Sequence, residues 1–249
     1  MMGMLATPEA LRHTLQLIEP AIADFVPPNS PFDPAGSWSH VYRISMLGNS
    51  AARGPGGQLK IRRSPQADGS VLEVEQQWTM GKQYASWAKA SIECAADRLS
   101  MPRRWMVETW TCRPDRQEET GSRLKFSAQP AGQEIRFSGV RKPPLTVGGQ
   151  WTLDWALLDA LQRLPKDSGN LSFNMIEDYD LLRPRQQLSS TGRLAVKLAG
   201  KERELFGFCQ IGTGTLPTHY WLDAQHRLLF VIHYYRVYVL QTNDSGGEK

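Results

Sequence analysis

Hydrophobic and polar residues alternate with a period of two over most of the chain. The clearest example spans 123–138, where every second residue is apolar on both sides of a turn at Gln129–Gly132. Such alternation is typical of antiparallel strands with one buried and one solvated face. Similar stretches, each bounded by Gly, Pro, Asp or Ser, occur at 40–47, 57–63, 70–79, 84–95 and 104–112. The spacing predicts an antiparallel meander.

Two segments show a helical period instead. The first begins at Thr7-Pro8-Glu9, a helix-start pattern with a capping residue and a first-turn proline, and ends before Val26-Pro27-Pro28. The second covers 151–164, where apolar residues form one stripe, Thr152 and Asp159 lie on the other side, and Pro165 ends the helix. We expect the second helix to lie on the sheet.

Strands resume after this helix, at 172–177, 180–188, 192–199 and 204–211. The most apolar segment follows as a hairpin, with strands at 218–222 and 227–240 and a turn at Asp223–His226. In this hairpin Leu222 is expected to pair with Arg227. The unbroken apolar run from Leu228 to Ile232 indicates a strand that is buried on both faces.

Together these elements predict a mainly β fold with flanking helices (α+β). We expect a strongly curved antiparallel meander sheet, or half-barrel, with one amphipathic helix on its concave face and an N-terminal helix. The predicted organisation is an N-terminal helix and Pro-rich connector at 1–36, a single β domain at 37–241 and a disordered tail at 242–249.

Composition excludes several classes of protein. The chain has 249 residues, 41% hydrophobic and 22% charged, with a net charge of only +4, so neither a disordered protein nor a nucleic-acid-binding protein is expected. No apolar run is long enough to predict a transmembrane segment. The start of the chain has no signal-peptide pattern, which predicts cytoplasmic localisation, or the cell envelope if an export signal had been removed.

Motifs for common cofactors and metals are missing. Gly212-Thr213-Gly214 begins like a dinucleotide fingerprint, but Pro217 replaces the third glycine. The three cysteines form no C-x-x-C pair. In the expected hairpin register His219 and His233 point to opposite faces, so they cannot share a metal. We therefore expect no cofactor and no metal site.

Acidic residues cluster at Glu177, Asp178 and Asp180, in a polar connector. Two carboxyl groups can divide into acid and base only if burial separates their pKa values. The polar surroundings favour a solvated cluster instead.

Aromatic residues exceed what an aliphatic sheet core needs, with eight Trp and seven Tyr. Large rings with polar tips commonly line ligand clefts. The first hypothesis is therefore a binding protein for a small hydrophobic or carbohydrate-like ligand. The residues expected to bind it on the concave face are Trp78, Trp87, Trp110, Trp221, Tyr234, Arg236 and Tyr238.

Two other functions stay open. A hydrolase or lyase would use the same cleft, with His219 or His233 as base and Tyr220 or Tyr235 as acid. A structural or assembly subunit would use exposed rings to bind a protein partner.

The order of these elements resembles the curved half-barrels of the lipoprotein-carrier superfamily, the LolA- and LolB-like proteins. The stretches 192–198, 205–211 and 216–223 also look like the closing strands of uncharacterised bacterial proteins of that shape. The resemblance implies a sheet around a hydrophobic cavity, with helix 151–164 as plug or lid. It further implies that the cavity accepts acyl chains or another hydrophobic ligand, and it assigns no functional residue.

Overall fold

One large sheet dominates the computed structural model, which describes residues 8–22, 25–47, 56–80, 84–113 and 117–241. Within these residues fifteen strands and two α-helices are formed. The helices are α1 (Pro8–Ile22) and α2 (Asp154–Arg163). The strands are β1 (Trp38–Met46), β2 (Gly57–Gln66), β3 (Gly69–Met80), β4 (Tyr84–Ala95), β5 (Pro102–Cys112), β6 (Leu124–Ala131), β7 (Glu134–Ser138), β8 (Leu145–Thr146), β9 (Trp151–Leu153), β10 (Leu171–Glu177), β11 (Leu181–Leu198), β12 (Lys201–Ile211), β13 (Thr218–Leu222), β14 (Leu228–His233) and β15 (Arg236–Leu240).

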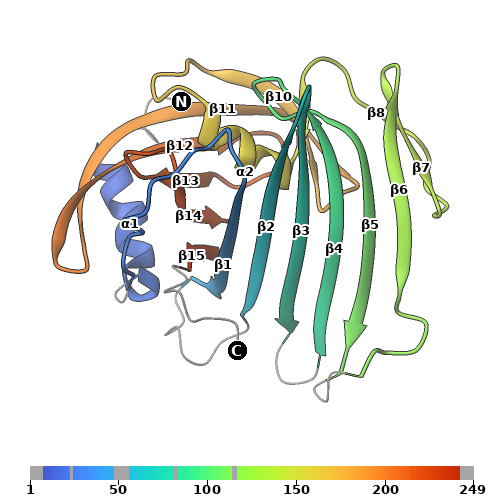
Figure 1. Ribbon diagram of the computed structural model, residues 1–249, viewed down its shortest axis with the longest axis horizontal. Coiled ribbons are helices and arrows are strands. Elements are labelled where there is room, and N and C mark those ends of the chain that lie inside the picture. The colour runs from blue at the N-terminus through green and yellow to red at the C-terminus, as the bar shows by residue number, and fades with distance from the viewer. Residues whose placement is uncertain (1–7, 23–24, 48–55, 81–83, 114–116, 242–249) are drawn as a thin grey trace.

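The strand order follows the sequence almost throughout, and the first and last strands of the chain pair with each other. Strands β8 to β1 follow one another in reverse sequence order, β1 pairs with β15, and β15 to β9 complete the sheet. All neighbours are antiparallel except β9 and β10, which are parallel. Figure 1 shows the sheet curving strongly around α2. The predicted fold class, a curved antiparallel sheet with a helix on its concave face, is confirmed.

The concave face is apolar where α2 covers it. Ile61, Val74 and Ala90 are successive partners across β2, β3 and β4, and all three are buried. Strands β5 and β9 are far apart in the strand order, yet the Trp105 ring of β5 lies 6.0 Å from the Trp151 ring of β9. Side chains of the two halves of the curved sheet thus contact each other across its interior. Alternation thus buries one face of every strand in this region.

Helix α1 packs on the opposite face of the C-terminal strands. Phe25, just after the helix, meets Phe230 of β14 with ring centroids 4.8 Å apart, and Arg43 donates to the Ala21 carbonyl at 2.8 Å. On the α2 side the Trp155 ring lies 6.4 Å from Tyr238 of β15. Because helices cover both faces, β14 is apolar without alternation, as expected from its sequence.

The N-terminal part of the predicted helix 151–164 is a strand. Trp151 to Leu153 form β9, which pairs with β10 through Asn174 to Ile176, and the helix begins only at Asp154. The backbone N–H and C=O groups of these residues bond to β10, whereas in a longer helix they would have formed hydrogen bonds within the helix. This short strand is also the one parallel neighbour in a sheet expected to be antiparallel throughout.

Three strand boundaries also differ from the predictions. The stretches 180–188 and 192–199 belong to a single strand, β11, which bends through a bulge between Ser190 and Gly192. The predicted strand 227–240 is two strands, β14 and β15, joined by a turn at 234–235. The chain between β6 and β7 turns at 132–133, so part of the predicted turn 129–132 belongs to β6.

The hairpin register differs as well. A bulge between Trp221 and Leu222 pairs Leu222 with Leu228, and His219 lies opposite Ile232 instead of Phe230. His233 lies opposite Thr218. His219 and His233 still point to opposite faces. His233 pairs with Thr218, and Thr218 and His219 are neighbours on one strand, so their side chains point to opposite faces.

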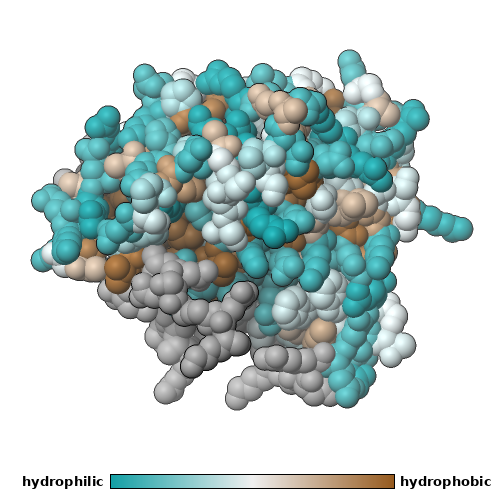
Figure 2. Space-filling view, in the orientation of Figure 1, coloured by the Kyte–Doolittle hydropathy of each residue, from teal (hydrophilic) through white to brown (hydrophobic). Residues whose placement is uncertain are grey.

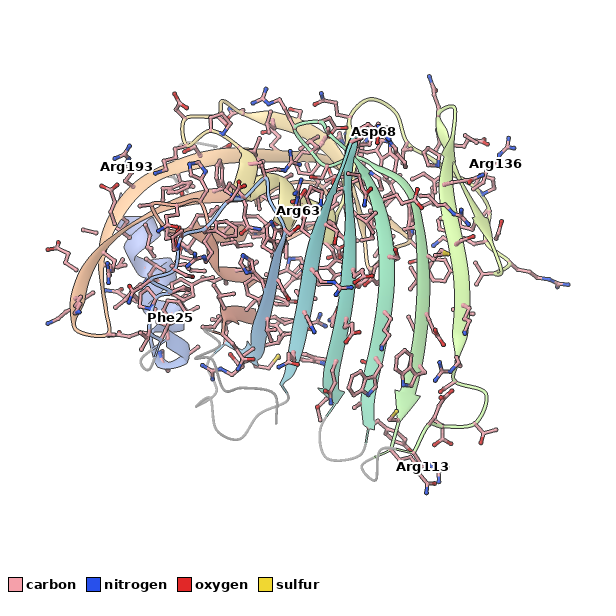
Figure 3. The ribbon with its side chains drawn as sticks, viewed as in Figure 1. Phe25, Arg63, Asp68, Arg113, Arg136 and Arg193 are labelled. Carbon is pink, nitrogen blue, oxygen red and sulfur yellow. The ribbon has the colours of Figure 1, made fainter. Side chains whose placement is uncertain are left out.

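A buried ionic cluster attaches α2 to the sheet. The Asp159 carboxylate is fully buried; it lies 2.8 Å from Arg63 Nε of β2 and 3.1 Å from Arg163 Nη2, and it accepts a 2.6 Å hydrogen bond from Ser100 Oγ. Figure 3 shows Arg63 in the middle of the molecule next to α2, whereas Arg136 and Arg193 extend from its surface. Asp159 and Thr152, expected on the polar side of the helix opposite the apolar stripe, are therefore both fully buried.

His40 of β1 contacts the C-terminal turn of α2. Its Nε2 donates to Gln162 Oε1 at 3.0 Å, and the same oxygen accepts from the Leu228 amide. Burial lowers the pKa of His40 from 6.5 to about 4. The ring thus stays neutral in the folded protein at mildly acidic pH, while it is protonated in the unfolded chain.

This difference predicts a pH dependence of stability. Between pH 6.5 and 4 the unfolded chain binds the additional proton, so stability falls as the pH falls. From pH 7 to pH 5 we expect His40 to reduce the free energy of unfolding by about 2 kcal/mol. Urea unfolding at pH 7 and pH 5 gives the loss of free energy of unfolding for the wild type and for His40→Gln. The difference between these two losses measures the contribution of His40. Equal losses in both proteins would contradict the assignment.

Within the described residues, no helix is both long and apolar enough to cross a lipid bilayer. The face of the molecule seen in Figure 2 is mostly hydrophilic, with hydrophobic residues visible between the polar ones. The predicted disordered tail at 242–249 lies outside the described residues.

Candidate functional site

A cavity of about 390 Å³ lies between α2 and the strands β10, β11 and β13–β15. We call it the aromatic cavity. Its volume is in the range that holds a small organic ligand. Five of its lining residues are tryptophan or tyrosine: Trp155 of α2, Tyr220 of β13, Tyr234 and Tyr235 in the turn after β14, and Tyr238 of β15.

One wall of the aromatic cavity is apolar because it belongs to the core. Trp155 and Leu158 come from the inner side of α2, and Val231 comes from β14. Tyr220 is buried and its hydroxyl donates to Gln210 Oε1 at 2.7 Å, which fixes its ring. This wall can contact the apolar part of a ligand without moving.

The opposite wall is charged and hydrogen-bonded. Glu177 at the end of β10 is buried; its Oε2 lies 2.6 Å from Arg183 Nε and its Oε1 lies 3.1 Å from His233 Nε2. His233 Nδ1 lies 2.9 Å from Thr218 Oγ1. Burial opposes ionisation of Glu177, but hydrogen bonds from His233 and Arg183 together hold its pKa below the ordinary value. Glu177 is therefore a fixed carboxylate.

Asp154 at the start of α2 behaves in the opposite way. Its carboxylate accepts hydrogen bonds from the amides of Trp155 at 2.8 Å and Asp178 at 3.0 Å. Burial and the neighbouring Asp178 nevertheless raise the pKa of Asp154 well above its usual range. The Asp154 residue is half-buried. One side of it faces the cavity and protein surrounds the rest. Two carboxyl groups with pKa values shifted in opposite directions thus face one cavity.

Asp178 also lines the aromatic cavity. It follows Glu177 in a tight turn in which Asp178 has φ 50° and Tyr179 has φ 71°, both in the left-handed region that non-glycine residues rarely adopt. Burial of its carboxyl and repulsion from Glu177 raise the pKa of Asp178, and Arg236 partly offsets this. Strained backbone of this kind is concentrated at functional sites.

Six of the residues singled out from the sequence line this cavity. They are Tyr220, His233, Tyr234, Tyr235, Arg236 and Tyr238. Alternation along one strand would have divided them between two faces, but the turn between β14 and β15 brings them together. Tyr234 has φ 54° in this turn, which redirects the chain after His233.

The other predicted site residues lie elsewhere. His219 is on the opposite face of β13, and Trp221 is fully buried on that same face, against Gly207. Trp87 and Trp110 stack at 5.9 Å, and the strand register places them on the face opposite to Ser86 and Thr109. The three rings therefore do not lie on the concave face as expected, since odd and even positions of a strand point to opposite faces. Trp87 and Trp110 nonetheless border a neighbouring hollow, and their part in ligand binding stays a prediction.

Trp78 remains on the concave side but outside the aromatic cavity. The guanidinium of Arg236 lies 4.7 Å from the centre of its ring, an attractive cation–π contact. Trp78 is half-buried and borders a neighbouring hollow.

The cavity residues that were not predicted as site residues include Asp154, Trp155, Glu177 and Arg183. Glu177 was expected in a solvated acidic cluster, but it is buried and paired with His233 and Arg183. One signal was available, because Leu171, Phe173 and Met175 alternate as buried residues and Glu177 continues their series. Within the described residues, no three His, Cys, Asp or Glu side chains are arranged to hold a metal ion.

Comparison with known proteins gives one informative similarity. No family model and no curated protein matches the chain. A solved structure described as a β-barrel-like protein of a domain of unknown function, DUF1849, from Brucella abortus is similar, with a TM-score of 0.56 and 10% identity. The alignment covers 83% of this chain and 95% of that one. At this identity the likeness concerns the fold alone, so membership in the lipoprotein-carrier superfamily stays a prediction. The chain has a β-barrel-like fold.

Proposed function

We propose that this protein binds a small amphipathic ligand in the aromatic cavity. The observation that carries the proposal is the combination of an apolar aromatic wall with a fixed polar wall in one cavity of about 390 Å³. An apolar ligand body would lie against Trp155, Val231 and Tyr238. Its hydroxyl or other polar head would face Asp154 and the Glu177 side chain.

The polar wall is suited to binding because it is preorganised. Arg183 and His233 hold the Glu177 carboxylate before any ligand arrives, so ordering it on binding has little entropic cost. The raised pKa of Asp154 favours its protonated form more than in an ordinary aspartate, and in that form the carboxyl group can donate a hydrogen bond. A hydrophobic ligand in a cavity covered by a helix also agrees with what the resemblance to lipoprotein carriers implies.

A hydrolase or lyase is the second candidate. The opposite pKa shifts of Asp154 and Glu177 favour it, because a neutral acid and an ionised carboxylate can act as general acid and base. Release of 4-nitrophenol from 4-nitrophenyl β-glucoside would support this candidate. A binding protein would leave that compound intact.

A fluorescence titration tests the binding proposal. The probe is N-phenyl-1-naphthylamine, a neutral aromatic amine that fluoresces more strongly in an apolar environment. We expect saturable binding of one probe per chain, and displacement by octyl β-glucoside below its micelle-forming concentration, because both would occupy the aromatic cavity. A linear, unsaturable signal, or a probe that octyl β-glucoside does not displace, would contradict the proposal.

A further inference from the structure

A second hollow of about 330 Å³ lies on the concave face of β3, β4 and β5, next to the aromatic cavity. We call it the polar trough. Residues of the three strands line it together with Ser122 from the segment before β6 and Tyr179. The tryptophans Trp78, Trp87 and Trp110 are among these residues, so the trough combines aromatic rings with polar side chains. Asp178 and Arg236 line both the polar trough and the aromatic cavity, so the two hollows adjoin at these residues.

The trough begins where the apolar lining of the concave face ends. On β3 the face changes from Val74 to Gln76, and on β5 it changes from Val107 to Thr109. Each pair of residues is two positions apart on one strand, so both members point to the same face. The same sheet face is therefore apolar under α2, and beyond it carries uncharged polar side chains next to Trp78 and Ala88.

Several polar groups of the trough have no partner in the protein. Within the part of the chain that the structure describes, the side chains of Gln76, Thr109 and Thr111 make no hydrogen bond, although all three are half-buried. Ser86 and Ser122 use their hydroxyls on backbone carbonyls, with Ser122 also accepting from the Thr111 amide at 3.1 Å. One amide and two hydroxyl groups thus converge on one hollow with their hydrogen-bonding capacity unused.

Charge in the trough is confined to its border with the aromatic cavity. Asp178 and Arg236 carry opposite charges there, and Arg236 is held over the Trp78 ring. Uncharged donors and acceptors match a neutral, hydroxyl-bearing ligand better than an anion or a cation, because neither sign of charge would be compensated.

We propose that the polar trough is a second subsite, which binds the hydroxyl-rich, carbohydrate-like part of the ligand whose apolar part occupies the aromatic cavity. This inference rests on the proposed function and extends it by naming the ligand class, an amphiphile with a neutral sugar head. The head passes between Asp178 and Arg236. Hydrogen bonds from Gln76, Thr109 and Thr111 then replace the water that these groups contact in the free protein.

A pair of probes that differ only in the head tests this subsite. Octyl β-glucoside has one glucose ring and octyl β-maltoside has two, and both are used below their micelle-forming concentrations. In the wild type we expect octyl β-maltoside to bind about fivefold more tightly, since the second ring reaches the trough. In the double variant Thr109→Val/Thr111→Val, which keeps shape but removes both hydroxyls, we expect this advantage to disappear.

The controls separate this proposal from the previous one. Binding of N-phenyl-1-naphthylamine and the melting temperature should be unchanged in the double variant, and Thr146→Val, an exposed change on β8, should keep the maltoside advantage. Equal affinity of the wild type for both glycosides, or an advantage that survives in the double variant, would overturn the trough subsite. If the naphthylamine probe itself does not bind, the aromatic cavity proposal fails instead.

Discussion

Replacing Asp159 with alanine is expected to lower the free energy of unfolding by about 3 to 5 kcal/mol, because it removes one partner of a buried ion pair. Arg63 is almost fully buried and would keep its charge opposite an apolar side chain. Ser100 would lose the acceptor of its 2.6 Å hydrogen bond. The change also removes the ionic link between α2 and β2.

Urea unfolding at neutral pH, followed by circular dichroism, measures this effect. The matched control is Glu73→Ala, which removes an acidic partner of Arg62 on the exposed face of the same strand pair. Exposed pairs contribute little, so the control should unfold at nearly the wild-type urea concentration. A similar small change for both variants would show that the buried cluster does not hold α2 on the sheet.

Enlarging Val231 to phenylalanine is expected to weaken binding of N-phenyl-1-naphthylamine about a hundredfold, which corresponds to about 2.7 kcal/mol. Val231 lines the aromatic cavity on β14, where it faces the α2 side. The larger ring occupies space that the probe needs. The larger side chain fills part of the cavity and is not forced into the packed core, so the fold should be retained.

The same fluorescence titration compares this variant with Leu216→Phe, a matched increase in size at an exposed position. Leu216→Phe should bind the probe like the wild type. Thermal unfolding of all three proteins shows whether they are folded at the temperature of the titration. Unchanged probe affinity in folded Val231→Phe would place the probe outside the aromatic cavity.

The sequence predicts most of the sheet because strand signals are local. From β1 to β7 every second side chain faces the core, and the turns between strands contain Gly, Pro, Asp or Ser. These patterns depend on neighbouring residues only. The second helix and the N-terminal helix follow from the same kind of local period.

Long-range pairing explains what the sequence does not show. Trp151 to Leu153 have an apolar pattern that fits a helix, and only the position of β10 beside them makes them a strand. The turn between β14 and β15 contains Tyr234 and Tyr235, with no glycine or proline to mark it. Tertiary contacts on both sides of these strands override the local preference.

The candidate site was predicted in part for the same reason. The aromatic and basic residues around the last hairpin were recognisable as unusual, and the structure brings six of them to one cavity. Asp154 and Glu177 were not, because their importance depends on burial and on partners far away in the sequence. His233 is 56 residues from Glu177, and only the folded sheet places them 3.1 Å apart.

Native mass spectrometry with octyl β-glucoside tests the central claim most directly, because it counts ligands on the intact chain. Wild type and Val231→Phe are each incubated with the glycoside below its micelle-forming concentration and transferred gently into the gas phase. The account predicts one bound glycoside per wild-type chain and none, or a small fraction, on Val231→Phe. Equal occupancy of both proteins, or no adduct on either, would contradict a ligand site in the aromatic cavity.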